Sequence, residues 1–302
     1  MRAVSGAPAW GPAREGAGQT GVPGSARRLR VACVQLNTAG DTAANVAVAR
    51  RLAAEAAHAG AQLIALPETW AYKGRRAGIL ASAEPVDGPS NSVLAGLAAE
   101  QGVFILAGSH YEPSPRAGRV FNTSVLFGPT GATVAVYRKI HLFDAVSGTA
   151  VYRESEELVA GDEIVTAQLE AAPGDAVTVG LSICYDLRFP ELYRALASRG
   201  AELLVVPSAF THHTGSAHWA VLLRARAVEN GCFVVAPNQT GTHLPGRRCY
   251  GHSMIVDPWG VVLAQAAEEV GICVADLDLD AVAKVRTQIP SLTGRRPEVY
   301  GA

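Results

Sequence analysis

Short apolar runs alternate with helix-like segments along this chain, and the same rhythm occurs in both halves. In the first half, residues 30–36 form an apolar run, a helix that Asp41 can cap extends to Gly60, and residues 62–66 form the next run. In the second half, apolar runs at 177–183 and 202–206 flank a helix-like segment at 190–199. Strands that are joined through helices bury their apolar sides in stacked layers. The rhythm therefore predicts a layered α/β fold.

Turn residues mark further elements. Gly and Pro residues at 128–131 and at 257–260 each separate two apolar runs, which predicts two hairpins. We expect a helix that Ser216 caps and that ends at Gly231, and a last strand that closes the sheet. The stretch 139–161 is predicted to be a long loop, and long loops in compact domains are often functional. The stretch after Pro290 is predicted to be an extended tail.

No change of composition divides the chain internally, so we expect one domain at residues 29–296, with a tail at 297–302. Residues 1–28 are rich in Gly, Ala, Pro and Arg and lack periodic apolar residues, which favours a disordered extension. A mitochondrial transit peptide is the alternative, because the stretch has arginines and only one acidic residue, Glu15. Its prolines and weak amphipathic pattern speak against that alternative.

Charge and cysteine content exclude several classes of protein. The net charge is −1, with 26 basic and 27 acidic residues, so nucleic acid and anionic membranes are not expected partners. No apolar run approaches the roughly 20 residues of a membrane span. The five cysteines are scattered without C-x-x-C spacing, which argues against a disulfide framework and a structural zinc site. We therefore expect a cytoplasmic protein in a reducing environment.

Three strand ends carry groups that suit covalent catalysis. Cys184 follows the run at 177–183, Glu68 follows the run at 62–66, and Lys139 follows a predicted strand at 132–137. A thiol attacks an amide as its thiolate, so a base must accept its proton, and a carboxylate with a raised pKa performs this well. A fixed cation and a backbone N–H, here Lys139 and the amide of Tyr185, can stabilise the oxyanion that develops.

Each of these residues also has a purely structural interpretation. A lone buried cysteine is most often an apolar filler, a glutamate after proline is often a helix cap, and a lysine at a strand end is most often a solvated edge charge. The three together are far more specific than any one of them, because three different strand ends would each carry the required group.

The motifs around these residues resemble those of the nitrilase superfamily, the carbon–nitrogen hydrolases. The matching stretches are Leu66-Pro67-Glu68, YRKIHLFD at 137–144 and CYDLRFPE at 184–191. The resemblance implies a four-layer-forming α-β-β-α sandwich, a Glu68–Lys139–Cys184 triad, no metal and no cofactor. It also implies a homodimer or higher homo-oligomer. Glu154, in an E-S pair 15 residues beyond Lys139, resembles a further family glutamate that would orient Lys139 or assist proton transfer.

The sequence after the nucleophile indicates a branch of this superfamily. True nitrilases tend to have Cys-Trp-Glu there, whereas this chain has CYD at 184–186 and resembles the amidase branches. Further stretches are most similar to the Nit1-type branch, the deaminated-glutathione amidases, while others are shared with the ω-amidases. The resemblance implies hydrolysis of a small-molecule amide through a cysteine thioester. The alternatives are ω-amidase action on 2-oxoglutaramate and hydrolysis of an N-carbamoyl amino acid.

Both amidase branches act on 2-oxo acids, and an anionic substrate calls for an arginine in the pocket. Arg188, four residues after the nucleophile, is the first candidate, and a structural ion pair is its alternative role. Arg247 and Arg248 are weaker candidates. Trp70 is expected to narrow or reshape the pocket, and Phe210 lies in a branch-like stretch and is expected to line it.

Three rival interpretations compete with this one. The first is a papain-like Cys–His hydrolase, with His141 or His252 as the partner of Cys184. The second is a metal site assembled from the histidines at 212, 213 and 218 with Cys184, although their spacing matches no known zinc pattern. The third is a catalytically silent interaction scaffold on an enzyme fold.

Overall fold

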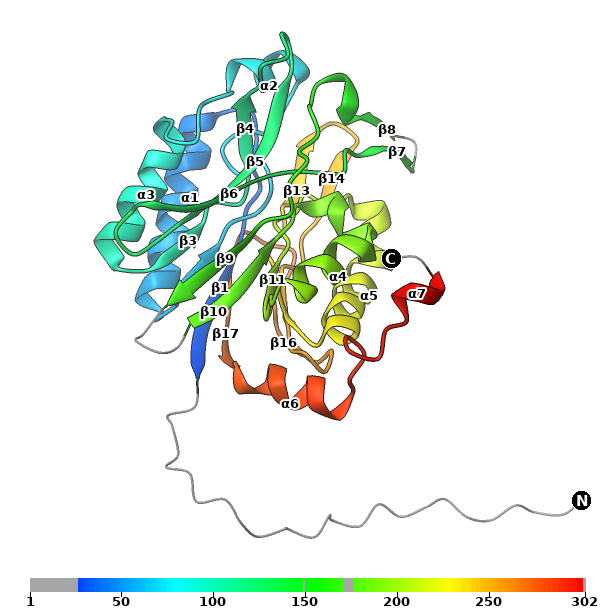
Figure 1. The fold of residues 1–302 in the computed structure, drawn as a ribbon. Helices are drawn as coiled ribbons and strands as arrows, with labels where there is room; N and C mark the ends of the chain where they lie inside the picture. Colours follow the sequence, from blue (N-terminus) through cyan, green and yellow to red (C-terminus); the bar gives the residue numbers. More distant parts are fainter. Residues whose placement is uncertain (1–26, 149, 171–175, 301–302) are drawn as a thin grey trace, which may run out of the picture.

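The protein's structure, a computed structural model, describes residues 27–148, 150–170 and 176–300, and two β-sheets pack face to face at its centre (Figure 1). The first strand, β1, begins at Arg28, so the predicted disordered extension lies, except at its end, outside the described residues.

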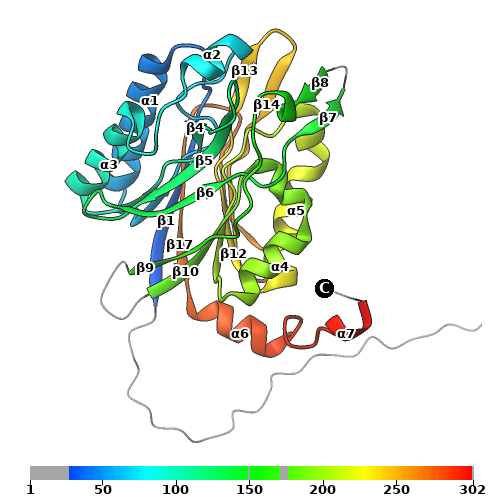
Figure 2. The same cartoon turned by 45° about the horizontal axis from the view of Figure 1, so that its top comes forward.

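The first sheet has the strand order β17-β1-β2-β3-β5-β4, and β6 pairs with β5. Its strands are β1 (Arg28–Gln35), β2 (Leu63–Ala65), β3 (Phe104–Leu106), β4 (His110–Pro113), β5 (Val120–Phe127), β6 (Thr133–Arg138) and β17 (Gly271–Asp278). Strands β1, β2 and β3 are parallel. Helices α1 (Thr42–His58) and α3 (Pro89–Gln101) cover the outer face (Figures 1 and 2). The predicted cap of α1 is confirmed, because the Asp41 side chain accepts a hydrogen bond from the Ala44 amide at 3.1 Å.

The second sheet has the order β16-β15-β12-β11-β10-β9. Its strands are β9 (Thr166–Glu170), β10 (Ala176–Leu181), β11 (Leu203–Val205), β12 (Phe233–Ala236), β15 (Met254–Val256) and β16 (Val262–Gln265). Strands β10, β11 and β12 are parallel. Helices α4 (Pro190–Ser198) and α5 (His212–Asn230) cover its outer face (Figure 2). Both predicted hairpins are confirmed, as β5–β6 and β15–β16.

Alternation along β1 shows how the layers are held together. Val31 and Cys33 point into the core between the two sheets, whereas Ala32 and Val34 point into a second core beneath α1 and α3. A third core lies between the second sheet and α4 and α5. Strands buried on both faces need apolar residues at successive positions, which explains the unbroken apolar runs in the sequence. The predicted single-domain α-β-β-α sandwich is confirmed.

Short elements crowd the end of the sandwich that lies at the top of Figure 1. They are α2 (Arg76–Ala81), β7 (Asp144–Ser147), β8 (Ala150–Arg153), the 3₁₀ turn η1 (Glu154–Glu156), β13 (Thr240–Leu244) and β14 (Arg247–Tyr250). The stretch predicted to be a long loop therefore contains a hairpin, β7–β8. Its strands are four residues each and partly exposed, so they lack the apolar runs that revealed the buried strands. At the opposite end lie α6 (Asp280–Gln288) and α7 (Pro297–Tyr300).

Two predicted boundaries were wrong. Helix α5 begins at His212, well before Ser216, because the Gly215 amide already donates to the Thr211 carbonyl at 2.8 Å. The tail predicted to be extended contains α7, where the Val299 amide donates to the Arg296 carbonyl at 2.9 Å.

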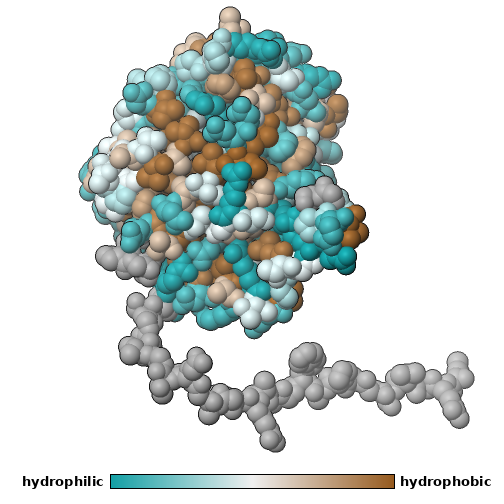
Figure 3. Space-filling view, in the orientation of Figure 1, coloured by the Kyte–Doolittle hydropathy of each residue, from teal (hydrophilic) through white to brown (hydrophobic). Residues whose placement is uncertain are grey.

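The surface seen in Figure 3 mixes hydrophilic and hydrophobic residues, and hydrophobic ones gather in its upper half over β4, β5 and β6. Among residues 27–148, 150–170 and 176–300, no helix combines the length and the apolar character that crossing a membrane requires.

Candidate active site

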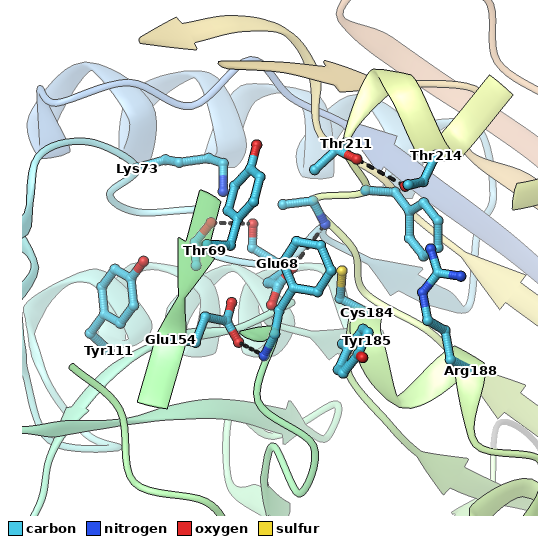
Figure 4. Close-up of a pocket in the computed structure, with 14 residues that line it drawn as sticks. Glu68, Thr69, Lys73, Tyr111, Glu154, Cys184, Tyr185, Arg188, Thr211 and Thr214 are labelled. Atoms are coloured by element: carbon cyan, nitrogen blue, oxygen red, sulfur yellow. Dashed lines mark hydrogen bonds between the residues drawn. The ribbon is translucent and has the colours of Figure 1, made fainter. Parts of the chain in front are cut away.

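Two of the three predicted catalytic side chains, Glu68 and Cys184, line one pocket at the edge of the sheets (Figure 4), and the third, Lys139, is buried behind its wall in contact with Glu68. Glu68 follows β2 by three residues, Lys139 follows β6 directly, and Cys184 opens the 3₁₀ turn η2 (Cys184–Arg188) just after β10. The pocket spans about 530 Å³ of space, part of which is open to solvent. Its position matches the crevice at the carboxyl ends of strands where open α/β sheets bind ligands.

Cys184 sits on a strained turn. Its φ angle is +47°, in the left-handed region that non-glycine residues rarely adopt, and its amide donates to the Pro207 carbonyl at 2.9 Å. Such strain costs on the order of 1–3 kcal/mol and persists where the surrounding structure enforces it. The turn displays the partly buried thiol at the strand tip, as the position of Cys184 in the sequence predicts.

Lys139 bridges two carboxylates. Its Nζ atom lies 2.9 Å from Glu68 Oε1 and 2.9 Å from Glu154 Oε2. The Lys139 side chain is only 1% exposed, so its contact with Glu68 occurs away from bulk water, while Glu154 is partly exposed. Glu154 Oε2 also accepts a hydrogen bond from the Phe143 amide at 2.8 Å. Glu154 is therefore in contact with Lys139, as the resemblance implies.

Two groups that the sequence did not reveal hold the Glu68 carboxylate. Asn122 Nδ2 donates to Oε1 at 2.9 Å, and the Ala209 amide donates to Oε2 at 2.9 Å. Asn122 is one of three successive polar residues in β5, none of which stands out in the sequence, and Ala209 contributes through its backbone. Each Glu68 oxygen thus has a fixed donor.

Neighbouring charges shift the pKa values of Glu68 and Lys139 in opposite directions. Burial alone raises the pKa of Glu68, but the charges of Lys139 and Lys73 and hydrogen bonds to the carboxylate outweigh it, and the pKa falls below the ordinary 4.5. The sequence predicted that burial would raise the pKa of Glu68. In the structure this pKa is lowered instead. Burial lowers the pKa of Lys139, yet the charges of Glu154 and Glu68 raise it well above 10.5.

The pKa of the Cys184 thiol, unlike that of Glu68, is raised. Burial, followed by the charge of Glu68, raises the pKa of the thiol well above 9.0, and the charge of Lys139 opposes this only in part. The resting site therefore holds a neutral thiol, a carboxylate at Glu68 and an ammonium at Lys139. A base that is ionised beside a protonated nucleophile is the arrangement needed for proton transfer at the moment of attack.

Asp186 ties the cysteine turn to the strand that carries the lysine. It is fully buried, accepts hydrogen bonds from Tyr137 Oη at 2.6 Å and from the Ile183 amide at 2.8 Å, and contacts His141 Nδ1 at 2.7 Å. The carboxylate thus fixes the distance between the two segments. The CYDLRFPE stretch contains Asp186, but only the structure reveals what it contacts.

The pocket wall contains some of the predicted substrate contacts. Arg188, Phe210 and Tyr185 line it. The Arg188 guanidinium lies 5.2 Å from the centre of the Phe210 ring and 6.0 Å from that of Tyr185, with 3.3 Å between Nη1 and His218 Nδ1. An arginine framed by aromatic faces suits a planar carboxylate.

Trp70 is placed elsewhere, so the expected contact between Trp70 and the substrate is wrong. Its side chain is fully buried in the core beneath α1 and α3, and it is not part of the pocket wall. Thr69 has a φ of +54°, and this turn directs the chain away from the cleft immediately after Glu68. Arg248 pairs with Glu268 outside the pocket, and Arg247 lines a neighbouring cavity.

The structure does not assemble the sites that the rival hypotheses require. No histidine belongs to the described wall of the Cys184 pocket: His141 pairs with Asp186, and His252 stacks on Tyr250. Among residues 27–148, 150–170 and 176–300, no cluster of three His, Cys, Asp or Glu side chains is arranged to hold a metal ion.

Comparison with known proteins agrees with this geometry. The carbon–nitrogen hydrolase family model matches residues 30–287. Deaminated glutathione amidase of Synechocystis is 42% identical over 87% of this chain and 97% of that protein. Omega-amidase NIT2 of Mus musculus is 39% identical over 90% of this chain and 96% of that protein.

Solved structures extend the comparison. The NitFhit protein of C. elegans has a TM-score of 0.82 and 38% identity, covering 90% of this chain and 66% of that chain. An amidase of Nesterenkonia sp. AN1 has a TM-score of 0.74 and 31% identity, covering 90% of this chain and 98% of that chain. In that amidase, a glutamate-to-glutamine mutant shows Michael addition of acrylamide at the active-site cysteine.

Proposed function

Because the chain belongs to the carbon–nitrogen hydrolase family, we propose that it hydrolyses a 2-oxo-acid amide, such as deaminated glutathione, through a thioester on Cys184. The observation that carries the proposal is the contact of one buried ammonium, Lys139, with two carboxylates beside the thiol. Glu68, Lys139 and Cys184 form the proposed triad, and Glu154 orients Lys139.

In the first half-reaction, the Glu68 carboxylate accepts the thiol proton as the Cys184 sulfur attacks the amide carbon. The carbonyl electrons move onto oxygen, and Lys139 and the Tyr185 amide are proposed to stabilise the oxyanion. When the oxyanion collapses, the C–N bond breaks and the amine leaves with the proton from Glu68. The products of this step are a free amine and an acyl thioester.

In the second half-reaction, Glu68 accepts a proton from water, and the hydroxide formed attacks the thioester carbon. Collapse of this second oxyanion breaks the C–S bond, and Glu68 returns the proton to the sulfur. The net reaction adds one water across the C–N bond and restores the resting thiol. Neither half-reaction calls for an oxidant or a metal.

The pH dependence follows from the two opposing shifts. The active form holds Glu68 ionised and Cys184 protonated. Because the pKa of Glu68 is lowered below 4.5 and that of Cys184 is raised above 9.0, the midpoints of the acid and alkaline limbs of kcat/KM are expected outside this range, with a level rate around neutral pH. Initial rates measured across this range, with samples returned to pH 7 to check that the enzyme has not been inactivated, test the expectation. An acid limb near neutrality would contradict it.

The substrate is tested with a panel of amides. Deaminated glutathione, 2-oxoglutaramate, an N-carbamoyl amino acid and a simple nitrile are compared by release of ammonia or amine, and we expect deaminated glutathione to have the highest kcat/KM. Arg188, on one side of Cys184, supports an acyl half that bears a carboxylate. A preference for the carbamoyl compound or the nitrile would refute the proposed substrate class, and no turnover at all would favour a silent scaffold.

An ω-amidase activity is the second candidate. The observation in its favour is the 39% identity to Omega-amidase NIT2, close to the identity to the deaminated glutathione amidases. In the panel, this candidate corresponds to 2-oxoglutaramate having the highest kcat/KM.

We also propose a homodimer in the cytoplasm. Val221 and Val228 of α5 are exposed on the outer side of the sandwich, 67% and 52% respectively, where a second copy would cover them. The five cysteines are all free thiols, which suits a reducing compartment.

A further inference from the structure

A second cavity adjoins the catalytic pocket. It spans about 1130 Å³ of space, part of which is open to solvent, and its wall is built from the segment around α2, from β8 with the residues after it, and from the turn between β13 and β14. Both cavities share Lys73, Tyr111, Tyr152 and Glu154 in their walls. The two cavities are therefore direct neighbours, with these four residues between Cys184 and the second space.

The second cavity is rich in positive charge. Its basic wall residues are Lys73, Arg75, Arg76, Arg153 and Arg247, and its acidic ones are Glu154, Glu156 and Glu157. The acidic side chains are already engaged: Glu154 contacts Lys139, and the other two contact Arg76. Among the described ion pairs, none involves Lys73 or Arg247, although Glu157 is near enough to Arg247 to feel its charge.

Two of these cations converge at the junction of the cavities. The Arg247 guanidinium lies 4.2 Å from the centre of the Tyr152 ring and donates to the Val151 carbonyl at 3.1 Å, which fixes its position beside the shared wall. Burial lowers the pKa of His243 to about 3, and the charges of Lys73 and Arg247 contribute to that lowering. His243 is therefore neutral, and both cations lie close enough to it to lower its pKa.

The nucleophile lies between this corner and Arg188. In Figure 4, Arg188 is on one side of Cys184, and Lys73 and Tyr111 are on the other side, beyond Glu68. A substrate with its carbonyl at Cys184 must place its acyl half on one side and its amine half on the other. If Arg188 receives the carboxylate of the acyl half, the amine half points toward Lys73 and the second cavity.

On the basis of the proposed function, we propose that the amine half of the substrate extends toward the second cavity, and that Arg247 and Lys73 bind its carboxylate where the two cavities adjoin. The class of leaving group is then a peptide-like amine with a terminal carboxylate. An ammonia leaving group would use none of this space. The departing amine takes its proton from Glu68, so the position of its nitrogen is compatible with the reaction steps above.

Three substrates with the same acyl half test the proposal: deaminated glutathione, the same compound with its terminal carboxylate converted to an amide, and 2-oxoglutaramate. We expect the wild-type enzyme to hydrolyse the free carboxylate with a kcat/KM roughly 10- to 100-fold above that of the amidated form. Arg247→Gln is expected to remove most of this preference, and Lys73→Gln to reduce it.

Arg248→Gln is the matched control, because Arg248 is the next residue in β14 but pairs with Glu268 on the surface. It should keep the wild-type preference. Equal wild-type rates on the free and amidated compounds would overturn the proposal without any variant, as would equal losses on both compounds in Arg247→Gln. Failure to hydrolyse any of the three compounds would instead refute the proposed function, and turnover of 2-oxoglutaramate checks that each variant is folded.

Discussion

Replacing Cys184 with alanine is expected to lower kcat for amide hydrolysis by roughly 10⁴- to 10⁶-fold, because loss of the nucleophile removes the covalent route and leaves only binding and oxyanion stabilisation. Fold stability should change little, since Cys184 occupies a strained turn and its thiol faces the pocket. Ammonia or amine release on the best substrate measures the effect, and thermal unfolding reports the stability.

The control for this variant is Cys249→Ala. Cys249 is buried near the site, with its sulfur 3.7 Å from the Ala209 carbonyl, but it does not line the pocket. It should retain activity within a few-fold. Mass spectrometry of the wild-type enzyme with an electrophilic amide should find the adduct on Cys184. An active Cys184→Ala enzyme, or an adduct on Cys249 instead, would show that the nucleophile is misassigned.

Replacing Lys139 with methionine is expected to cost about 3–5 kcal/mol of the free energy of unfolding at pH 7, and to abolish most of the activity. The substitution removes the cation between the two carboxylates and leaves that of Glu68, whose side chain is only 5% exposed, without its charge partner. Denaturant unfolding measures the loss. Lys284→Met is the control, because Lys284 is 65% exposed and its pair with Asp278 is a surface contact.

The pH dependence of this loss has a defined sign. In the wild type, the pKa of Glu68 is lowered, so its ion pair stabilises the fold above the unfolded-state pKa and that contribution disappears as the pH falls through the folded-state value. In the variant, burial and the second carboxylate raise the pKa of Glu68, so protonation in acid relieves the strain. The difference between variant and wild type should therefore shrink as the pH falls.

A double substitution measures how much the ion pair between Glu68 and Lys139 contributes to the free energy of unfolding, apart from the effect of each residue alone. Glu68→Gln with Lys139→Met removes both charges, so the double variant should be more stable than the sum of the two single losses implies, by about 0.5–3 kcal/mol. Activity should stay low in all three variants. Strict additivity of the losses, or a Glu68→Gln enzyme with the full rate of amide hydrolysis, would contradict the proposed triad.

The features that could be predicted from the sequence share a physical origin. Each buried parallel strand appears in the sequence as an apolar run. Because these strands run in the same direction, the residues at their carboxyl ends lie at one edge of the sandwich. Glu68 and Cys184 follow such runs, whereas Lys139 follows β6, a less buried strand that pairs antiparallel with β5 and was recognised from the turn before it. Glu154 was predictable only through the family resemblance, because the hairpin that carries it has no comparable pattern.

The features that escaped prediction depend on exact backbone direction or on neighbours distant in sequence. Trp70 follows Glu68 by two residues, yet the left-handed conformation of Thr69 directs it into the core. The lowered pKa of Glu68 depends on how close Lys139 comes, which no local pattern reveals. The donors from Asn122 and Ala209 require the positions of both sheets.

The pairing of β1 with β17 has a consequence for how the chain folds. These strands bring residues 28–35 against residues 271–278, almost the whole domain apart in sequence. Loops of this length close slowly, and domains made on the ribosome fold as their chain emerges. The first sheet therefore stays incomplete until β17 has been synthesised, and in the meantime β1 presents an unpaired edge of the kind that promotes aggregation. A nascent or truncated chain that stops before residue 271 would need a chaperone to cover that edge.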